Sequence, residues 1–382
     1  MRIPALLALS AGLISPALAA TVRVATFNAS LYSERADGLV ERLRNDDPAA
    51  RKIAAVIQHK RPDILLLNEF DYDADGTAAD LFQQRYLAVP QYGQAEISYP
   101  YRYFAPVNTG VPSGFDLDGD GRCDGPGDAW GFGRHPGQYG MLVLSRFPIE
   151  QSAVRTFRDV LWRDMPGALA PQHPDGSSWY PPAAWHVFPL SSKSHWDVPV
   201  RTPLGTIHLL AAHPTPPVFD GPEDRNGRRN ADEIRFWRDY ISTQNADWIV
   251  DDEGRRGGLA AEARFVIVGD LNADPADGGG RREAIIELLE HPRILRMATP
   301  QSVGAEAAAW ADGGANTGHR GAHRHDTAAF GPQSGNLRVD YVLPSTGFRA
   351  TASGVFWPMP DETGADWLDA SDHRMVWVDL TD

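Results

Sequence analysis

Residues 265–272 read Phe265-Val266-Ile267-Val268-Gly269-Asp270-Leu271-Asn272, a short apolar run that ends in an acid and a carboxamide. A second junction of this kind lies roughly a hundred residues later, where Ala370-Ser371-Asp372-His373 precedes Met375-Val376-Trp377-Val378. Apolar runs rich in β-branched and aromatic residues predict buried strands. Two strands therefore carry polar side chains at their ends, and acids beside a carboxamide or an imidazole are typical of a metal-assisted hydrolase.

Strands and helices are expected to alternate along the chain. Apolar runs predict strands at 22–27, 64–67, 141–144, 196–200, 206–212, 266–268, 339–343 and 375–380. Helical spacing predicts helices at 48–60 and 283–289, and a third that Asn230 caps. Long stretches rich in Gly, Pro and aromatic residues separate these elements. Residues 21–382 are therefore expected to form a single mixed α/β domain with long loop insertions.

Polar residues stand at or just past the ends of most of these apolar runs. They are Asn28, Glu69, His213, Asp270, Asn272, Asp340, Asp372 and His373. Each of them alone could be an ordinary turn residue, since Asn and Asp are common after strands. Their repetition at strand ends favours a shared site.

The first twenty residues form a separate segment. One early Arg2, an apolar stretch and Ala17-Leu18-Ala19 before Ala20 are typical of a secretory signal peptide over residues 1–20. The stretch is too short to span a bilayer, and no later segment is apolar over a membrane-spanning length. We therefore expect a secreted or periplasmic protein with no stable membrane span.

Composition limits the choice of substrates. The formal net charge is −14, and Lys52, Lys60 and Lys193 are the only lysines. An acidic protein repels polyanions, which disfavours tight non-specific binding of nucleic acid. Cys123 is the single cysteine, so no internal disulfide can form.

The motifs, taken in order, resemble those of the endonuclease/exonuclease/phosphatase superfamily, the deoxyribonuclease-I-like proteins. The matching stretches are 25–28 (Ala-Thr-Phe-Asn), 63–69 (Asp-Ile-Leu-Leu-Leu-Asn-Glu), 140–148, 268–272, 338–343 and 371–373 (Ser-Asp-His). The resemblance implies a four-layer α/β sandwich, in which two packed mixed β-sheets are flanked by helices. It also implies a hydrolase of phosphoester bonds, phosphodiesters in the first place, that depends on Mg²⁺ or Mn²⁺.

The resemblance assigns a metal role to three residues. Glu69 would be the main metal ligand, with Asn28 and Asp372 beside it. Oxygen ligands without a nearby cysteine independently favour magnesium, manganese or calcium over zinc.

The same resemblance assigns catalytic roles to five others. Asp270 would orient and deprotonate the attacking water, and Asn272 would hold the water or the phosphate. His373 would donate to a non-bridging phosphate oxygen, and Asp340 would hold its other ring nitrogen. His213 would be a second phosphate donor or the acid for the leaving group. The family more often has Thr-His-Leu where this chain has Ala212-His213-Pro214.

Further candidates rest on weaker patterns. Arg225, Arg228, Lys193 and His195 are candidate substrate contacts, and for the arginines a solvated loop is an equal alternative. Asp116-Leu117-Asp118-Gly119-Asp120-Gly121 matches the first half of a calcium-binding loop, but Gly127 stands where the bidentate glutamate belongs. A structural Ca²⁺ at Asp116, Asp118 and Asp120 is therefore a hypothesis. The histidine-rich segment 319–326 fits a transition-metal site less well than a substrate-covering loop.

Three readings of the function stay open at this point. The substrate could be a small phosphoester or a lipid head group, or the protein could be a secreted nuclease acting on DNA or RNA. A third reading, from another class, is a non-catalytic calcium-stabilised binding module on the same fold. That reading predicts loss of catalytic side chains, and the core positions are all present. No protein partner can be inferred.

Overall fold

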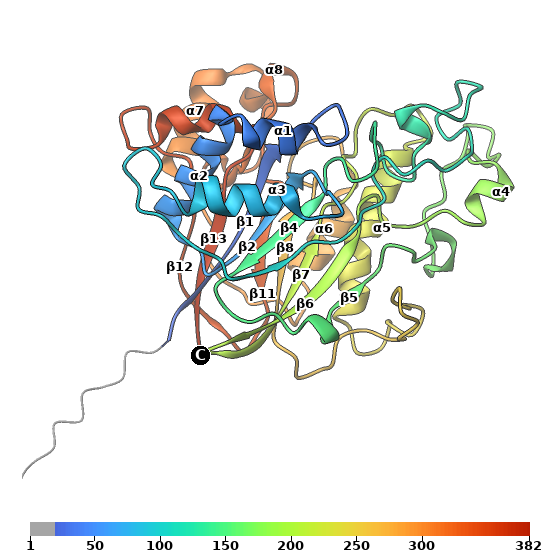
Figure 1. Cartoon of the computed structure of the whole chain (residues 1–382). Coiled ribbons are helices and arrows are strands. Elements are labelled where there is room, and N and C mark those ends of the chain that lie inside the picture. Colours follow the sequence, from blue (N-terminus) through green and yellow to red (C-terminus); the bar gives the residue numbers. More distant parts are fainter. Residues whose placement is uncertain (1–19) are drawn as a thin grey trace, which may run out of the picture.

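The computed structural model describes residues 20–382 (Figure 1). The predicted signal peptide lies outside the described residues except for Ala20. Within the described part of the chain, no helix is both long enough and apolar enough to cross a membrane.

Thirteen strands and eight α-helices form the described structure. The strands are β1 (Val22–Leu31), β2 (Ile64–Phe70), β3 (Tyr101–Tyr103), β4 (Met141–Ser145), β5 (Arg155–Thr156), β6 (His195–Thr202), β7 (Gly205–Ala212), β8 (Phe265–Asp270), β9 (Ala328–Ala329), β10 (Asn336–Leu337), β11 (Asp340–Pro344), β12 (Arg349–Val355) and β13 (Val376–Thr381). The helices are α1 (Gly38–Arg44), α2 (Pro48–Lys60), α3 (Thr77–Phe82), α4 (Pro182–Trp185), α5 (Arg225–Tyr240), α6 (Arg282–Leu289), α7 (Val303–Asp312) and α8 (Gly331–Ser334).

Two mixed sheets dominate the architecture. One has the strand order β12-β13-β1-β2-β4-β3, and the other has the order β11-β8-β7-β6-β5. Each sheet has one parallel pair near its centre, β1 with β2 and β7 with β8, and antiparallel neighbours on both sides. Strands that are covered on both faces need apolar residues at nearly every position, which explains the continuous apolar runs of the sequence.

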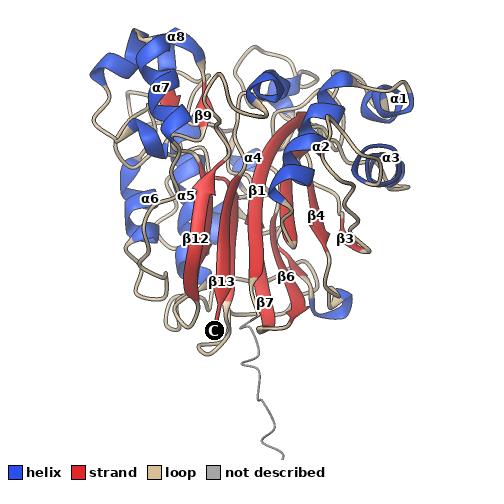
Figure 2. Ribbon diagram, turned by 90° about the vertical axis from the view of Figure 1, so that its left-hand side faces the viewer, coloured by secondary structure: helices blue, strands red, loops and turns tan. Residues whose placement is uncertain are grey.

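Alternate residues along these strands build separate cores. Between the sheets, Val24 and Leu66 of the first pack in one cluster with Leu209 and Val268 of the second. The residues next to them face outward and meet helices. Phe27 and Leu65 pack with side chains of α1 and α2. Leu210 and Ile267 pack with α5 and α6 on the opposite side. Figure 2 shows helices outside both sheets, so the predicted four-layer sandwich is confirmed.

One predicted boundary is wrong. Helix α5 begins at Arg225, five positions before the expected cap Asn230, and Asp224 is its N-cap residue. Asn230 is fully buried and donates its side-chain N–H groups to the carbonyl oxygens of Thr215 and Leu271, at 2.8 and 2.9 Å. Asn230 therefore joins the helix to two loops at the ends of β7 and β8.

Candidate active site

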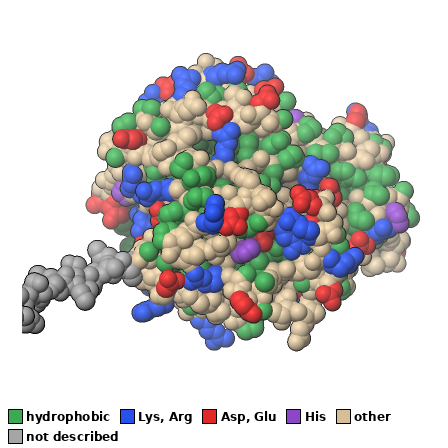
Figure 3. Space-filling view, turned by 60° about the horizontal axis from the view of Figure 1, so that its bottom comes forward, with side chains coloured by type: hydrophobic (Ala, Val, Ile, Leu, Met, Phe, Trp, Pro, Cys, Tyr) green, Lys and Arg blue, Asp and Glu red, His purple; other side chains and the backbone are tan. Residues whose placement is uncertain are grey.

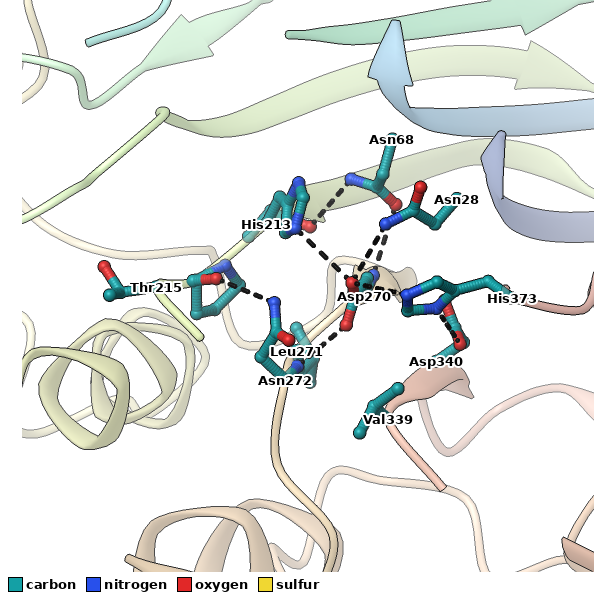
Figure 4. Close-up of polar contacts among 12 residues, drawn as sticks. Asn28, Asn68, His213, Thr215, Asp270, Leu271, Asn272, Val339, Asp340 and His373 are labelled. Carbon is teal, nitrogen blue, oxygen red and sulfur yellow. Dashed lines mark hydrogen bonds and ion pairs between the residues drawn. The ribbon is translucent and has the colours of Figure 1, made fainter. Parts of the chain in front are cut away.

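Asp270 is the centre of a polar cluster at the ends of the central strands (Figure 4). Its Oδ2 accepts a hydrogen bond from the Asn28 amide at 3.1 Å. The same oxygen lies 3.4 Å from Nε2 of His213 and 3.6 Å from Nε2 of His373. All four side chains are buried. The structure thus brings together four predicted residues that lie as much as 345 positions apart, from Asn28 to His373.

The backbone around Asp270 explains the sequence Gly-Asp-Leu-Asn. Gly269 has a φ of 148°, and a Cβ on it would lie 2.0 Å from the carbonyl oxygen of Ala212. Only glycine lets β7 and β8 approach so closely at this point. Asn272 adopts a left-handed φ of 51°; its backbone N–H donates to Asp270 Oδ1 at 2.9 Å, and its amide donates to Pro214 at 3.1 Å.

Asn68 joins the two sheets at this site, and sequence reasoning gave it no role. Its side chain accepts hydrogen bonds from the Asp270 backbone N–H at 3.2 Å and the Thr26 hydroxyl at 3.3 Å. It also donates to the carbonyl oxygen of Ala212 at 3.3 Å. An asparagine inside the apolar run of β2 was the available signal, because a buried polar side chain needs partners.

His373 is held by a chain of hydrogen bonds. Its Nδ1 lies 2.9 Å from Oδ2 of Asp340, which stands opposite Asp270 in the β8–β11 ladder. The Thr327 hydroxyl donates to the same Asp340 oxygen at 2.8 Å. The ring of His373 thus contacts Asp340 through Nδ1, and its Nε2 faces Asp270. Sequence reasoning gave Thr327 no role, because it lies in an irregular segment.

The two histidines beside Asp270 have opposite protonation. Burial lowers the pKa of His213 to about 4, assisted by the positive charge of Lys193 and opposed by Asp270. For His373, burial also disfavours the cation, but the charges of Asp340 and Asp270 outweigh it and raise the pKa to about 10. At neutral pH the site therefore holds one neutral imidazole and one imidazolium.

The pKa of Asp270 itself moves the other way from that of a merely buried acid. Burial alone would raise it, but the charge of His373 and the hydrogen bond from His213 outweigh burial and lower the pKa. The carboxylate is ionised throughout the neutral range.

Glu69, Asn28 and Asp372 are the residues expected to hold a metal. Both strands bend here: Ser30 and Glu69 have left-handed φ angles of 49° and 55°, and the β1–β2 register shifts between Asn28 and Leu31. Such bulges redirect side chains at sites. Asp372 is exposed at the rim, with its Oδ1 3.4 Å from the Ser30 hydroxyl.

The electrostatics of Glu69 suit a bound cation. Burial raises its pKa to about 6, against the charge of His373 and a hydrogen bond from Asn28. Glu69 forms no ion pair with a Lys or Arg of the described residues. A carboxylate without a cationic partner, beside an amide and a second carboxylate, is a donor set that fits Mg²⁺ or Mn²⁺.

A second group of candidate ligands lies deeper. Asp270, Asp340 and His373 present atoms within 4.8 Å of one another. The two carboxylates hold His373 as an imidazolium, however, and an imidazolium has no lone pair for a metal. We therefore favour Glu69 over this group as the metal ligand.

The candidate substrate contacts are placed differently from one another. Arg225 pairs with Glu223 and lies over the ring of Trp179, and Arg228 donates to the carbonyl oxygens of Glu223 and Ala170. Neither arginine contacts the residues around Asp270. His195 is buried between Ser191 and the carbonyl oxygen of Glu233. Lys193 alone lies close enough to influence the site's charges.

Neither the acidic loop nor the histidine-rich segment 319–326 forms a hydrogen bond or an ion pair with Asp270. Asp116, Asp118 and Asp120 present carboxylate oxygens within 4.8 Å of one another. In the histidine-rich segment, Nδ1 of His323 lies 3.2 Å from Asp326. The segment continues to Ala328, which forms a β-bridge with His373.

Comparison with known proteins identifies the family of this chain. The model of the Endonuclease/Exonuclease/phosphatase family matches residues 25–373. An endonuclease/exonuclease/phosphatase from Beutenbergia cavernae is 19% identical with a TM-score of 0.52, over 94% of this chain and 71% of that one. A sphingomyelinase C from Streptomyces griseocarneus is 16% identical with a TM-score of 0.48, over 95% and 100%. A family protein from Leptotrichia buccalis is 13% identical with a TM-score of 0.48, over 94% and 98%.

A sequence comparison with curated proteins found no significant match. The family model nevertheless covers nearly the whole described chain and includes every residue around Asp270. This chain belongs to the Endonuclease/Exonuclease/phosphatase family.

Proposed function

We propose that the protein is a divalent-metal-dependent hydrolase that cleaves phosphoester bonds, phosphodiesters in the first place, by in-line attack of an activated water. One observation carries the proposal: an ionised Asp270 faces a neutral His213 and a cationic His373. Titratable groups whose environments push their pKa values apart are typical of acid–base sites.

The contacts of Asp270 suggest a separate catalytic role for each of its neighbours. Asp270 accepts a hydrogen bond from the attacking water and receives its proton as the water attacks. Asn272 fixes the carboxylate through its backbone N–H. Nε2 of His373 and of His213 faces the same space and can donate to phosphate oxygens, where negative charge develops.

Glu69, with Asn28 and Asp372, would hold Mg²⁺ or Mn²⁺. The bound dication would neutralise charge on the phosphate oxygens. The chain's own contribution is to keep Glu69 partly buried and ionisable and to aim it from a strained backbone position.

The net charge of the chain supports a small substrate better than a duplex. The whole chain carries a net charge of −14, and on the face that Figure 3 shows, which lies at the strand ends remote from Asp270, Lys and Arg side chains are interspersed with Asp and Glu. A nuclease needs a basic groove along the nucleic acid. We therefore place small phosphodiesters or lipid head groups before DNA or RNA.

A hydrolysis assay tests the proposal. Purified protein would be assayed with magnesium, manganese or calcium against bis(p-nitrophenyl) phosphate, p-nitrophenyl phosphate, sphingomyelin and plasmid DNA. Asp270→Asn should abolish metal-dependent cleavage without loss of folding, and Glu69→Gln should weaken Mn²⁺ binding in calorimetry. Full activity of Asp270→Asn would contradict the mechanism, and absence of cleavage with every substrate would favour the binding-module reading.

Three further predictions accompany the proposal. Residues 21–382 act as one catalytic domain. The protein is exported after cleavage near Ala19 or Ala20, and N-terminal sequencing of the mature protein tests this export.

The loop of Asp116, Asp118 and Asp120 binds Ca²⁺. Calorimetry with Asp118→Asn tests that prediction, because catalytic Mn²⁺ binding should be unchanged while a separate Ca²⁺ event is lost.

A further inference from the structure

Lys193 is a buried lysine whose ammonium group has no partner among the described residues. Only 6% of its surface is exposed. Its Nζ forms neither a hydrogen bond nor an ion pair with any residue of the described chain. Nζ is not among the fully enclosed polar atoms, so a ligand that the described chain does not itself provide can reach this ammonium group.

The backbone around Lys193 is fixed on both sides of the residue. The Lys193 carbonyl oxygen accepts a hydrogen bond from the Asn108 N–H at 2.9 Å. The preceding Ser192 N–H donates to Oε1 of Glu233 at 2.6 Å, and Oε2 of Glu233 accepts from the Thr215 N–H at 2.6 Å. Glu233, from α5, thus ties the segment of Lys193 to the loop that follows His213.

The charged groups near Lys193 belong to the site. Burial lowers the pKa of Lys193; Glu233, Glu69 and Asp270 oppose this shift, and Arg229 adds to it. The same ammonium charge lowers the pKa of His213. The charge of Lys193 therefore acts together with those of Glu69, Asp270 and His213.

Of the three acids near Lys193, Glu233 and Asp270 accept hydrogen bonds from other groups of the chain, and Glu69 is the expected metal ligand. Both oxygens of Glu233 are occupied by backbone N–H groups. Both oxygens of Asp270 accept hydrogen bonds from Asn28 and Asn272. The guanidinium of Arg229, the other cation nearby, is bound to the carbonyl oxygens of Leu190 and Pro189 at 2.9 and 3.0 Å. Lys193 is thus an uncommitted positive charge beside Asp270.

We propose that Lys193 binds the substrate, with its ammonium group donating to a non-bridging phosphate oxygen on the His213 side of Asp270. His373 would supply the cationic donor on one side and Lys193 the cationic donor on the other, where the histidine is neutral. The proposal rests on the proposed phosphoester chemistry for its substrate, but anion binding by Lys193 can be measured without turnover.

Lysine NMR gives that measurement, because the chain has only three lysines. Inorganic phosphate would be titrated into metal-free protein labelled with ¹³C- and ¹⁵N-lysine. The Lys193 side-chain signal should shift on phosphate binding, and the signals of Lys52 and Lys60 should stay in place. Lys193→Met assigns the signal and should weaken phosphate binding about 10- to 100-fold, the range for a hydrogen bond to a charged group.

Lys60→Met is the matched control, because it removes the same charge from a lysine that lies over the rings of Phe356 and Trp377. An unmoved Lys193 signal, in wild-type protein that binds phosphate, would overturn the proposal. So would equal phosphate affinities of folded Lys193→Met and the control.

Hydrolysis separates this proposal from the proposed function. Active wild-type protein with an unchanged KM in Lys193→Met would reject Lys193 and keep the enzyme. Lysine-dependent phosphate binding without any hydrolysis would keep Lys193 as an anion-binding residue and reject the enzyme.

Discussion

His213 and His373 face the same oxygen of Asp270 at 3.4 and 3.6 Å, yet their surroundings differ. Nδ1 of His373 contacts Asp340 at 2.9 Å, whereas Nδ1 of His213 is buried without a hydrogen-bond partner. A second carboxylate makes one ring a cation, whereas burial, assisted by the charge of Lys193, leaves the other neutral. The comparison shows that the partner of the far ring nitrogen decides what each histidine can do.

The largest expected effect is the loss of the cationic donor. His373→Gln should lower kcat/KM about 100- to 1000-fold, the cost of removing one preorganised donor to the transition state. His208→Gln is the matched control, because His208 has a similar contact with Asp197, at 2.8 Å, outside the site. If kcat/KM of folded His373→Gln falls by less than about threefold, far below the range expected for a lost donor, His373 has no part in the mechanism.

Removal of the Asp340 carboxylate should bring the protonation of His373 closer to that of His213. Asp340→Asn lowers the pKa of His373, because one of the two charges that hold its proton is gone. We expect a loss of about 10- to 100-fold at neutral pH, and a smaller loss as the pH falls and the ring regains its proton. A pH–rate profile parallel to that of wild-type protein would show that Asp340 does not act through the protonation of His373.

Removal of His213, the neutral donor, should lower kcat/KM less than removal of His373, the cationic donor. A hydrogen bond from a neutral group contributes about 0.5–1.5 kcal/mol, so His213→Gln should lower kcat/KM by about tenfold. Steady-state kinetics of the two glutamine variants, measured side by side, test the order. An effect of His213→Gln larger than that of His373→Gln would reverse the assigned roles.

His213 should also make folding sensitive to acid. Its pKa is about 4 in the folded chain, below the ordinary value of 6.5. The unfolded chain therefore binds the proton first, and stability falls as the pH drops from 6.5 toward 4. At about pH 5, protonation of His213 in the unfolded chain lowers the free energy of unfolding by about 2 kcal/mol relative to neutral pH.

Urea unfolding of wild-type protein and His213→Gln at neutral and acid pH measures this contribution. The variant should lose less stability between the two conditions than wild-type protein does. Equal losses would show that His213 is not held neutral by burial.

Much of this site could be predicted because strand ends are visible in sequence. The predicted helix 48–60 and the runs before Asn28, Glu69, His213 and Asp270 correspond to α2, β1, β2, β7 and β8. Since the ends of the parallel pairs meet at one edge of each sheet, residues at those ends converge. The family motifs then supplied roles that spacing alone could not.

Other features depend on tertiary contacts that have no local pattern. Asn68 looks like part of a strand and in fact joins two sheets, and Thr327 orients Asp340 from an irregular segment. The start of α5 was misplaced because Asn230 is a good cap residue by type, whereas here its amide joins two loops. The unpaired state of Lys193 likewise depends on how Glu233 and Asp270 are occupied, which only the folded chain reveals.

The central claim is that Asp270 stands between a neutral and a cationic histidine. The most direct test is a ¹⁵N-NMR titration of histidine-labelled, metal-free protein, with His213→Gln and His373→Gln for assignment. The account predicts that His373 keeps its proton well into the alkaline range and that His213 stays neutral until the pH falls toward 4. Titration of both rings together near 6.5, the ordinary value for a histidine, would contradict it.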